Sequence, residues 1–159
     1  MKLFFLTAIA IVGAFGALAC GGDDSSSMPM DGGSGKNMTV DPAAVQVMLS
    51  NWAVTPAQSA LTAGKVTFQA MHQMDHGMNA SAEGGATHEL IVAAEETPGS
   101  GSFSKILLKL TEIKPGESKT GSVELKPGTY ELSCQVGEVV QGKAVSHYAK
   151  GMHTTVTVK

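Results

Sequence analysis

The sequence has little positive charge and few aromatic residues. Its eleven basic residues are all lysines, and its formal net charge at pH 7 is −3. A nucleic-acid surface needs clustered positive charge to neutralise phosphates, so we expect no nucleic-acid partner. Aromatic residues make up only 5% of the 159 residues, against 43% for all hydrophobic residues. Branched aliphatic side chains must therefore fill much of the core of the single domain that this length allows.

The sequence also lacks the motifs of common enzyme classes. It contains no paired carboxylates spaced for acid–base catalysis, no nucleophile elbow and no glycine-rich phosphate loop. It has no internal repeat and no long amphipathic helical pattern. We therefore expect a protein that is not an enzyme and that contains little helix.

Residues 1–19 have the features of an export signal. Lys2 is a short positive region, residues 3–18 are apolar and uncharged, and Ala17-Leu18-Ala19 directly precedes Cys20. This pattern predicts a signal peptide and not a retained membrane span. Cleavage after an Ala-x-Ala sequence suits ordinary signal peptidase. Small residues before a cysteine also resemble the bacterial lipobox, in which the cysteine is lipidated and becomes the mature N-terminus.

Residues 21–38 favour the lipoprotein interpretation. They are rich in Gly, Ser, Asp and Met without a hydrophobic period, so they cannot bury enough apolar surface to fold. We interpret residues 20–38 as a lipid-bearing Cys20 and a flexible tether, and residues 39–159 as the folded domain. This predicts a periplasm-facing membrane lipoprotein of the cell envelope. No Asp follows Cys20 directly, which favours the outer membrane if the host is Gram-negative.

The two cysteines, Cys20 and Cys134, need separate explanations. If Cys20 carries lipid, Cys134 is alone in a compartment that favours disulfides. Cys134 is then a buried inert thiol or a thiolate protected by a metal ion. A Cys20–Cys134 disulfide is the remaining alternative. We favour the metal-protected thiolate.

Residues 39–159 have the pattern of an all-β domain. Short segments of alternating or continuous apolar residues are separated by turn sequences such as Lys114-Pro115-Gly116 and Lys126-Pro127-Gly128. They predict strands near residues 45–50, 66–70, 87–94, 118–125, 129–134 and 154–158. Residues 106–108 suit either a strand or a short helix. Many short strands joined by Pro-Gly turns indicate a sandwich or a barrel.

Four side chains fall into a pattern near the strand ends. Cys134 ends the strand that begins with Pro-Gly-Thr-Tyr, His147 and Met152 follow in a His-x4-Met sequence, and His88 precedes the apolar residues 90–92. This arrangement resembles the cupredoxin family of blue-copper proteins, which includes plastocyanin and azurin. The resemblance covers roughly residues 40–159 and implies a cupredoxin-like Greek-key β-sandwich of seven to eight strands.

The resemblance also implies one copper ion, held by His88, Cys134, His147 and Met152. A thiolate and two imidazoles suit both Cu(I) and Cu(II), and a weak thioether bond tunes the potential. The implied function is single-electron transfer by a monomer between periplasmic redox partners, such as a cytochrome or an oxidase.

The sequence departs from the family pattern at residues 135–146. These residues separate Cys134 from His147, where the family has two to four residues. A longer loop is tolerable, because doubling its length costs only about 0.6 kcal/mol in closure entropy. His153 is an alternative ligand. Adjacent side chains on an extended segment point in opposite directions, so Met152 and His153 should not face one metal ion, and we favour His147.

A methionine- and histidine-rich segment precedes His88. Thioethers bind Cu(I) and imidazoles bind either oxidation state, so this segment, in a predicted loop, provides an auxiliary site for a second Cu(I). It supports an alternative function, that of a periplasmic copper carrier or storage protein. The other interpretation is a loop whose methionine content is incidental. The five side chains concerned are Met71, His72, Met74, His76 and Met78.

Overall fold

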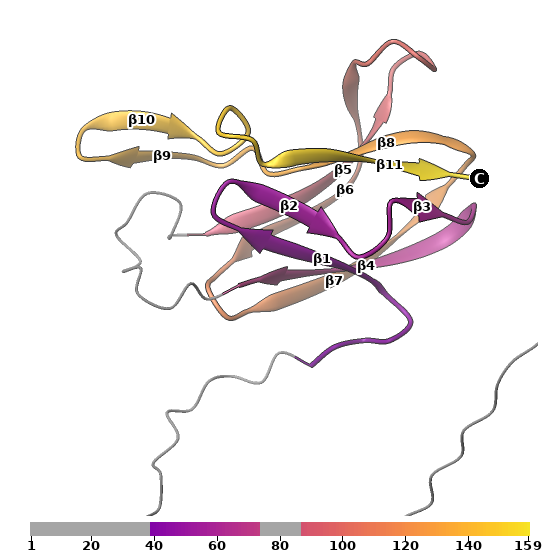
Figure 1. The fold of residues 1–159 in the computed structure, drawn as a ribbon, viewed down its shortest axis with the longest axis horizontal. Coiled ribbons are helices and arrows are strands. Elements are labelled where there is room, and N and C mark those ends of the chain that lie inside the picture. The colour runs from indigo at the N-terminus through magenta and orange to yellow at the C-terminus, as the bar shows by residue number, and fades with distance from the viewer. Residues whose placement is uncertain (1–38, 74–86) are drawn as a thin grey trace, which may run out of the picture. The chain divides into compact units, whose positions relative to one another are not determined.

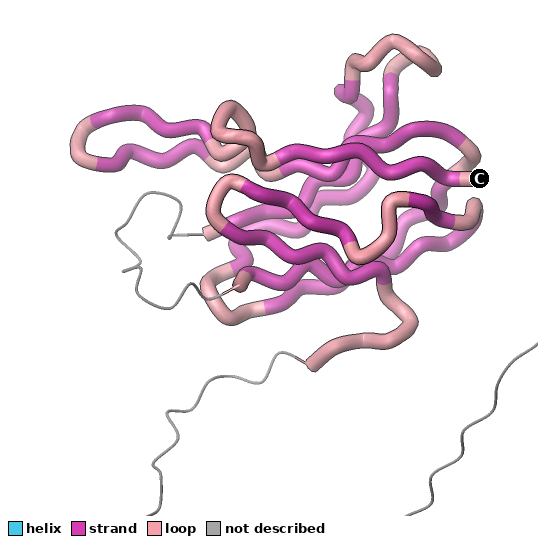
Figure 2. The backbone as a smooth tube through the Cα atoms, viewed as in Figure 1, coloured by secondary structure: helices cyan, strands magenta, loops and turns pink. Residues whose placement is uncertain are grey.

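The computed structural model describes residues 39–73 and 87–159, which form an all-β domain (Figures 1 and 2). These residues contain eleven strands and no helix. No helix that could span a membrane occurs in the described part of the chain. The predicted signal peptide, Cys20 and the tether lie outside the described residues. Those regions therefore stay predictions.

The first sheet contains four strands in the order β2-β1-β4-β7. β1 runs antiparallel to β2, whereas β1 and β4 are parallel, and β4 pairs antiparallel with β7. Alternating residues of β1 and β4 point between the sheets. The strands of this sheet are β1 (Val45–Ser50), β2 (Ala53–Pro56), β4 (Gly64–His72) and β7 (Ser118–Leu125).

The second sheet contains five strands in the order β3-β11-β8-β5-β6. Its pairings are antiparallel except for that of β3 with β11. The strands of this sheet are β3 (Ala60–Leu61), β5 (His88–Glu95), β6 (Phe103–Ile113), β8 (Gly128–Ser133) and β11 (His153–Val158). β9 (Gly137–Val140) and β10 (Lys143–Ser146) form a separate hairpin that projects from one end of the sandwich (Figure 1).

The core lies between the two sheets and is mainly aliphatic. Leu49 and Phe68 of the first sheet and Leu90 and Leu132 of the second sheet are fully buried in one cluster. Phe68 and Tyr130 are the aromatic residues among the buried members of that cluster in the described chain. This agrees with the expectation that aliphatic side chains would fill a core with few aromatics.

The predicted all-β sandwich is confirmed, and β1, β4, β5, β7, β8 and β11 overlap the strands that the hydrophobic pattern predicted. Residues 106–108 belong to the long strand β6 and not to a short helix. The described strands outnumber the expected seven to eight, because β2, β3, β9 and β10 have only two to four residues each. Strands this short contain too few alternations to be recognised from hydrophobic period alone.

Tyr130 fixes the connection between the two sheets at the β7–β8 turn. Its hydroxyl donates to the carbonyl oxygen of Lys126 at 2.8 Å and accepts from the Lys126 N–H at 3.1 Å. The ring itself is buried in the core. This resembles the tyrosine corner of other β-sandwiches, in which a hydroxyl satisfies backbone groups a few residues upstream.

We therefore expect Tyr130→Phe to lower the free energy of unfolding by about 1–2 kcal/mol, because two partly buried backbone groups lose their partner. Tyr148→Phe is the matched control. The Tyr148 hydroxyl donates to the Glu131 carboxylate at 2.9 Å from an exposed residue and bonds no backbone group of a turn. Denaturant unfolding of both variants measures the difference. Equal losses would show that the Tyr130 hydroxyl does not stabilise the turn.

Candidate metal centre

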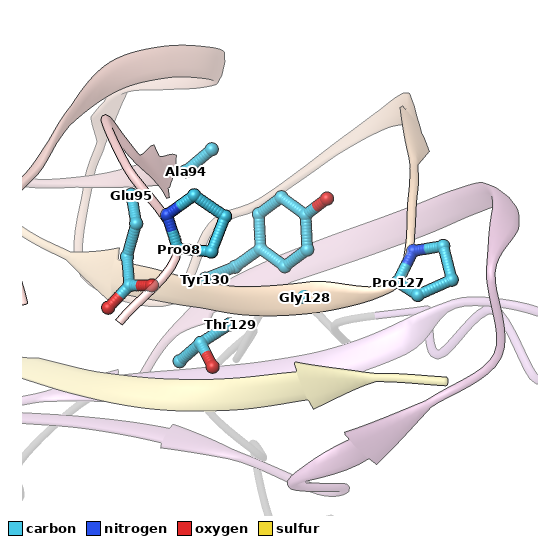
Figure 3. Close-up of a pocket in the computed structure, with 7 residues that line it drawn as sticks. All are labelled: Ala94, Glu95, Pro98, Pro127, Gly128, Thr129 and Tyr130. Carbon is cyan, nitrogen blue, oxygen red and sulfur yellow. The ribbon is translucent and has the colours of Figure 1, made fainter. Parts of the chain in front are cut away.

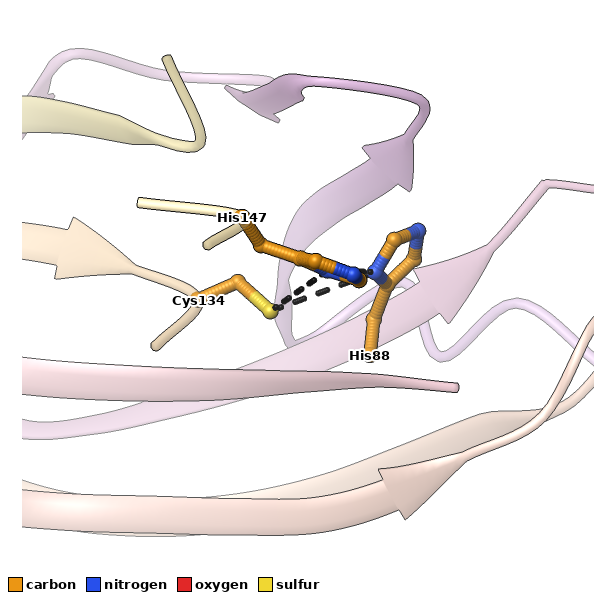
Figure 4. Close-up of side chains that lie close together, drawn as sticks. All are labelled: His88, Cys134 and His147. Carbon is orange, nitrogen blue, oxygen red and sulfur yellow. Dashed lines mark hydrogen bonds between the residues drawn. The ribbon is translucent and has the colours of Figure 1, made fainter. Parts of the chain in front are cut away.

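Three predicted ligands converge at one end of the sandwich (Figure 4). His88 is the first residue of β5, and Cys134 directly follows β8. β5 and β8 are paired antiparallel neighbours, so the start of one meets the end of the other. His147 comes from the loop that joins β10 to β11.

The donor atoms of these residues face one another in a fully buried space. The Nδ1 atoms of His88 and His147 are 3.1 Å apart. The Cys134 Sγ lies 3.6 Å from the His147 Nδ1 and 3.9 Å from the His88 Nδ1. All three residues have 0% exposure. This is the one cluster of three or more potential His, Cys or acidic metal ligands among the described residues.

These distances fit a metal ion in a trigonal plane. An ion bonded at about 2.0 Å to two imidazoles and about 2.3 Å to a thiolate separates its donor atoms by about 3.5–3.7 Å. The observed separations of 3.1, 3.6 and 3.9 Å bracket that range. The donor set of two nitrogens and one soft sulfur matches the preference of copper.

Met152 lies next to this cluster. It is fully buried and belongs to the same core cluster as Cys134. The Cys134 N–H donates to the Met152 carbonyl at 2.9 Å, and the Met152 N–H donates to the His147 carbonyl at 3.1 Å. His153 instead is exposed, with its ring stacked on Tyr148 at 4.5 Å. Met152 is thus buried while His153, the first residue of β11, is exposed, and His147 is the histidine that reaches the cluster.

Burial favours the uncharged forms of the His88 imidazole and the Cys134 thiol. Desolvation, together with the nearby His72 and His147, lowers the pKa of His88 to about 3. Burial also raises the pKa of the Cys134 thiol, although the Glu89 backbone N–H, 3.4 Å from its sulfur, opposes this shift. The His88 imidazole therefore presents a free lone pair at neutral pH. A bound cation must displace the thiol proton.

His72 is placed differently from the sequence prediction. It lies in strand β4 and not in a loop, it is buried, and its ring centroid is 4.0 Å from that of His88. Its Nδ1 is 2.8 Å from the Ile113 carbonyl oxygen. Met71 precedes His72 in the same strand, so their side chains point to opposite faces of the sheet. The expectation that both residues belong to one loop site was therefore wrong. Met74, His76 and Met78 lie outside the described residues.

The long segment between Cys134 and His147 folds back on itself. Residues 137–146 form the β9–β10 hairpin, which turns at Gln141 and Gly142, both with positive φ as a two-residue turn of this kind requires. The His147 N–H donates to the Val136 carbonyl at 3.0 Å and closes the base of the hairpin. The insertion thus returns the chain to the cluster, as a short loop would.

Glu138 of this hairpin orients His147. Its Oε1 is 3.2 Å from the His147 Nε2. A hydrogen bond from Nε2–H to this carboxylate fixes the tautomer in which Nδ1 carries the lone pair that faces the cluster. Nothing in the sequence distinguished Glu138 from the other acidic residues, because the contact depends on how the hairpin folds.

Trp52, in the β1–β2 turn, also contacts His147. The two rings meet edge to face, with centroids 5.4 Å apart and an interplanar angle of 87°. Trp52 has a φ of 63°, which is unusual for a bulky residue. A Cβ on Gly151, itself at φ +115°, would lie 3.3 Å from the Trp52 carbonyl oxygen. Residues 147–152, the ligand loop, therefore pack closely against this turn.

A surface pocket lies at the opposite end of β5 and β8 (Figure 3). Its lining includes Glu95 and Pro98 on one side and Pro127 and Tyr130 on the other. The Glu95 carboxylate accepts from the backbone N–H groups of Gly99 and Gly101, at 2.6 Å and 3.0 Å. The Glu95 carboxylate therefore stabilises the turn at residues 97–101. None of the predicted metal ligands lines the pocket.

The chain is similar to several solved structures. Dithionite-reduced auracyanin from the photosynthetic bacterium Roseiflexus castenholzii is 16% identical, with a TM-score of 0.51 over 74% of this chain and 97% of that chain. Rusticyanin from Thiobacillus ferrooxidans is 17% identical, with a TM-score of 0.44 over 75% and 79%. A multi-copper oxidase from Pediococcus acidilactici is 12% identical, with a TM-score of 0.46 over 78% and 28%. No protein-family model and no curated protein match the sequence.

The contact between Glu138 and His147 predicts an effect on metal affinity. We expect Glu138→Gln to weaken Cu(II) binding by about 10–100-fold, because the ring loses the carboxylate that orients it. Competition titration against a chelator of known affinity measures this change. Glu124→Gln, at an exposed position of β7, is the control for the loss of one negative charge. Equal affinity of the two variants would mean that Glu138 does not orient His147.

Proposed function

We propose that this chain, whose described domain has the cupredoxin fold, is a mononuclear blue-copper protein that carries single electrons. His88, Cys134, His147 and Met152 hold the copper. The observation that supports this most directly is the buried convergence of two imidazole Nδ1 atoms and one thiol sulfur. The proposed role is that of an electron carrier and not of an enzyme.

Bound copper supplies a one-electron couple between Cu(I) and Cu(II). The chain supplies a site that suits both states without rearrangement. The His88 imidazole is neutral, because burial keeps its pKa near 3. Cys134 would lose its proton to a bound cation, and the backbone N–H of Glu89, 3.4 Å from the sulfur, is placed to donate to the thiolate. The buried Met152 side chain would supply a thioether donor to the copper.

Backbone hydrogen bonds join the segments that carry the ligands. The N–H of Cys134 donates to the Met152 carbonyl, and the N–H of Met152 donates to the His147 carbonyl. The N–H of His147 donates to the Val136 carbonyl. Around the rings, His72 packs on His88, while Glu138 and Trp52 contact His147. A donor set held from so many sides changes little when the charge on the metal changes. Small structural change is what fast electron transfer requires.

The described residues favour an electron carrier over a copper carrier. Release of copper needs accessible or mobile donors, whereas the three clustered donors are fully buried. A second Cu(I) now depends on Met74, His76 and Met78, because Met71 and His72 lie in a strand and point to opposite faces. That second site stays a prediction, as does the carrier or storage role.

The proposed location follows from the N-terminal sequence. Lipid on Cys20 anchors the domain to a membrane of the cell envelope, facing the periplasm, and the outer membrane is favoured if the host is Gram-negative. The electron partners are redox proteins such as a cytochrome or an oxidase. The domain works as a monomer on its tether.

Addition of one equivalent of Cu(II) to the metal-free protein should produce an intense visible thiolate charge-transfer band, and Cys134→Ser should abolish it. His147→Ala should weaken the site, whereas the matched variant His153→Ala should keep the band, because His153 is exposed and stacked on Tyr148. Visible absorption and copper content are recorded together. A colourless adduct in the wild type, or a band that survives Cys134→Ser, would contradict the proposal.

The membrane anchor is tested by lipid labelling. The precursor should incorporate labelled palmitate in a bacterial host, and Cys20→Ala should release a soluble exported form. Several acyl chains, at about 0.8 kcal/mol per buried CH₂, hold a protein stably at a membrane. Mature protein that begins at Cys20 but carries no label would instead indicate ordinary cleavage after Ala19.

A further inference from the structure

The metal centre is closed to solvent. His88, Cys134 and His147 each have 0% exposure, and so does Met152. An electron that enters or leaves such a site cannot pass directly from a ligand atom to a partner at the surface. It must cross at least one more residue. The residues that cover the ligands therefore decide where a redox partner has to approach.

Two side chains of the described residues cover His147 and extend outward. Glu138 contacts its Nε2 at 3.2 Å, and Trp52 contacts its ring at a centroid distance of 5.4 Å. Trp52 is packed against the core and is partly exposed, and the Nζ of the exposed residue Lys150 lies over its ring, so the indole lies between His147 and a surface group. An indole offers a delocalised π system for electronic coupling, whereas a carboxylate does not. Trp52 is therefore the better electronic path.

From this geometry we propose that Trp52 is the surface end of the electron path to the metal centre, with His147 as the ligand that it contacts. The inference rests on the proposed function of the site. In the reducing direction, one electron passes from an external one-electron donor through the indole and the His147 ring to the oxidised centre. The donor is oxidised by one electron, the centre is reduced by one electron, and no bond or proton changes place.

The positive charge of Lys150 next to the indole determines whether the indole is itself oxidised during electron transfer. The Lys150 Nζ lies over the Trp52 ring, 5.3 Å from the centroid. A cation there is attracted to the electron-rich face of the neutral ring and opposes removal of an electron from it. The indole therefore acts as a bridge and is not itself oxidised. Lys150 also places a positive charge where the partner approaches.

The backbone holds Trp52 in this position. The residue keeps a φ of 63°, and its carbonyl oxygen lies against Gly151, one residue before the proposed ligand Met152. A bulky residue stays in this strained region only where its surroundings impose it, and such residues concentrate at functional sites. The ring contact with His147 is thus fixed by the same turn that supports the ligand loop.

The first experiment measures the reduction rate of the copper-loaded protein by hexaammineruthenium(II) in a stopped-flow instrument. Copper content, visible spectrum and midpoint potential are determined beforehand for each variant. Trp52→Leu should slow reduction severalfold at an unchanged potential, and Trp52→Phe should recover much of the rate because it keeps an aromatic ring. Tyr148→Leu is the control, because Tyr148 follows His147 in the chain and is exposed. It should react like the wild type.

The second experiment leaves the indole intact and changes the charge beside it. Oxidation by the anion hexacyanoferrate(III) at low ionic strength should slow roughly two- to tenfold in Lys150→Gln, because attraction of the anion to this surface is reduced. Lys126→Gln, at the exposed β7–β8 turn beside the pocket at the other end of β8, should have no such effect. The difference should disappear at high salt.

A third measurement does not use electron-transfer rates. Trp52 is the single tryptophan of the sequence, so its fluorescence reports on this position alone. Cu(II) should quench the emission much more than Zn(II), which is closed-shell and redox-inactive. Emission that is equal with the two ions would mean that the indole is not coupled to the centre.

The inference is overturned if Trp52→Leu reacts as fast as the wild type or faster, since loss of the ring would then merely open His147 to reagents. It is also overturned if Tyr148→Leu slows instead, or if Lys150→Gln and Lys126→Gln behave alike. These outcomes would not contradict the proposed function, because the rates are measured on copper-loaded protein that already shows the thiolate absorption band. A wild-type protein without thiolate absorption would overturn both.

Discussion

The structure depends on keeping two imidazole nitrogens and one thiol sulfur together away from water. The closest pair, the Nδ1 atoms of His88 and His147, are 3.1 Å apart with no exposure to solvent. Burying unpaired polar groups is unfavourable, so the sandwich must hold them there by other contacts. The Nε2 of His88, buried without a hydrogen-bond partner in the described chain, illustrates this cost. The stabilisation comes from an aliphatic core that continues from the two sheets up to the cluster.

The β9–β10 hairpin resolves the departure from the family pattern at residues 135–146. A long flexible loop between two ligands would let their separation vary. The hairpin avoids this, because its strands pair from Gly137 with Ser146 outward, and the bond from His147 to Val136 closes its base. The added residues also supply Glu138, which contacts the ligand from outside the sandwich. The insertion therefore supports the site without displacing it.

Enclosure by residues of the hairpin and of the β1–β2 turn would have a consequence for the proposed electron transfer. A dry site limits solvent reorganisation and keeps the His88 pKa low. It would also separate the proposed ligands from a redox partner, so the proposed electron path runs through a side chain that contacts them. Trp52, in contact with both His147 and the surface, fits that position. The same turn supports the ligand loop through Gly151.

The sequence by itself determined the all-β class, six of the seven longer strands (β6 was left open) and the spacing of His88, Cys134, His147 and Met152, because hydrophobic alternation and residue order are local properties of the chain. It also separated Met152 from His153, since neighbours on a strand point to opposite faces. Only the tertiary structure decided that His72 packs on His88 and that Glu138 and Trp52 cover His147. Each of these contacts joins separate segments of the chain or depends on how the hairpin folds. A local sequence pattern does not predict contacts of this kind.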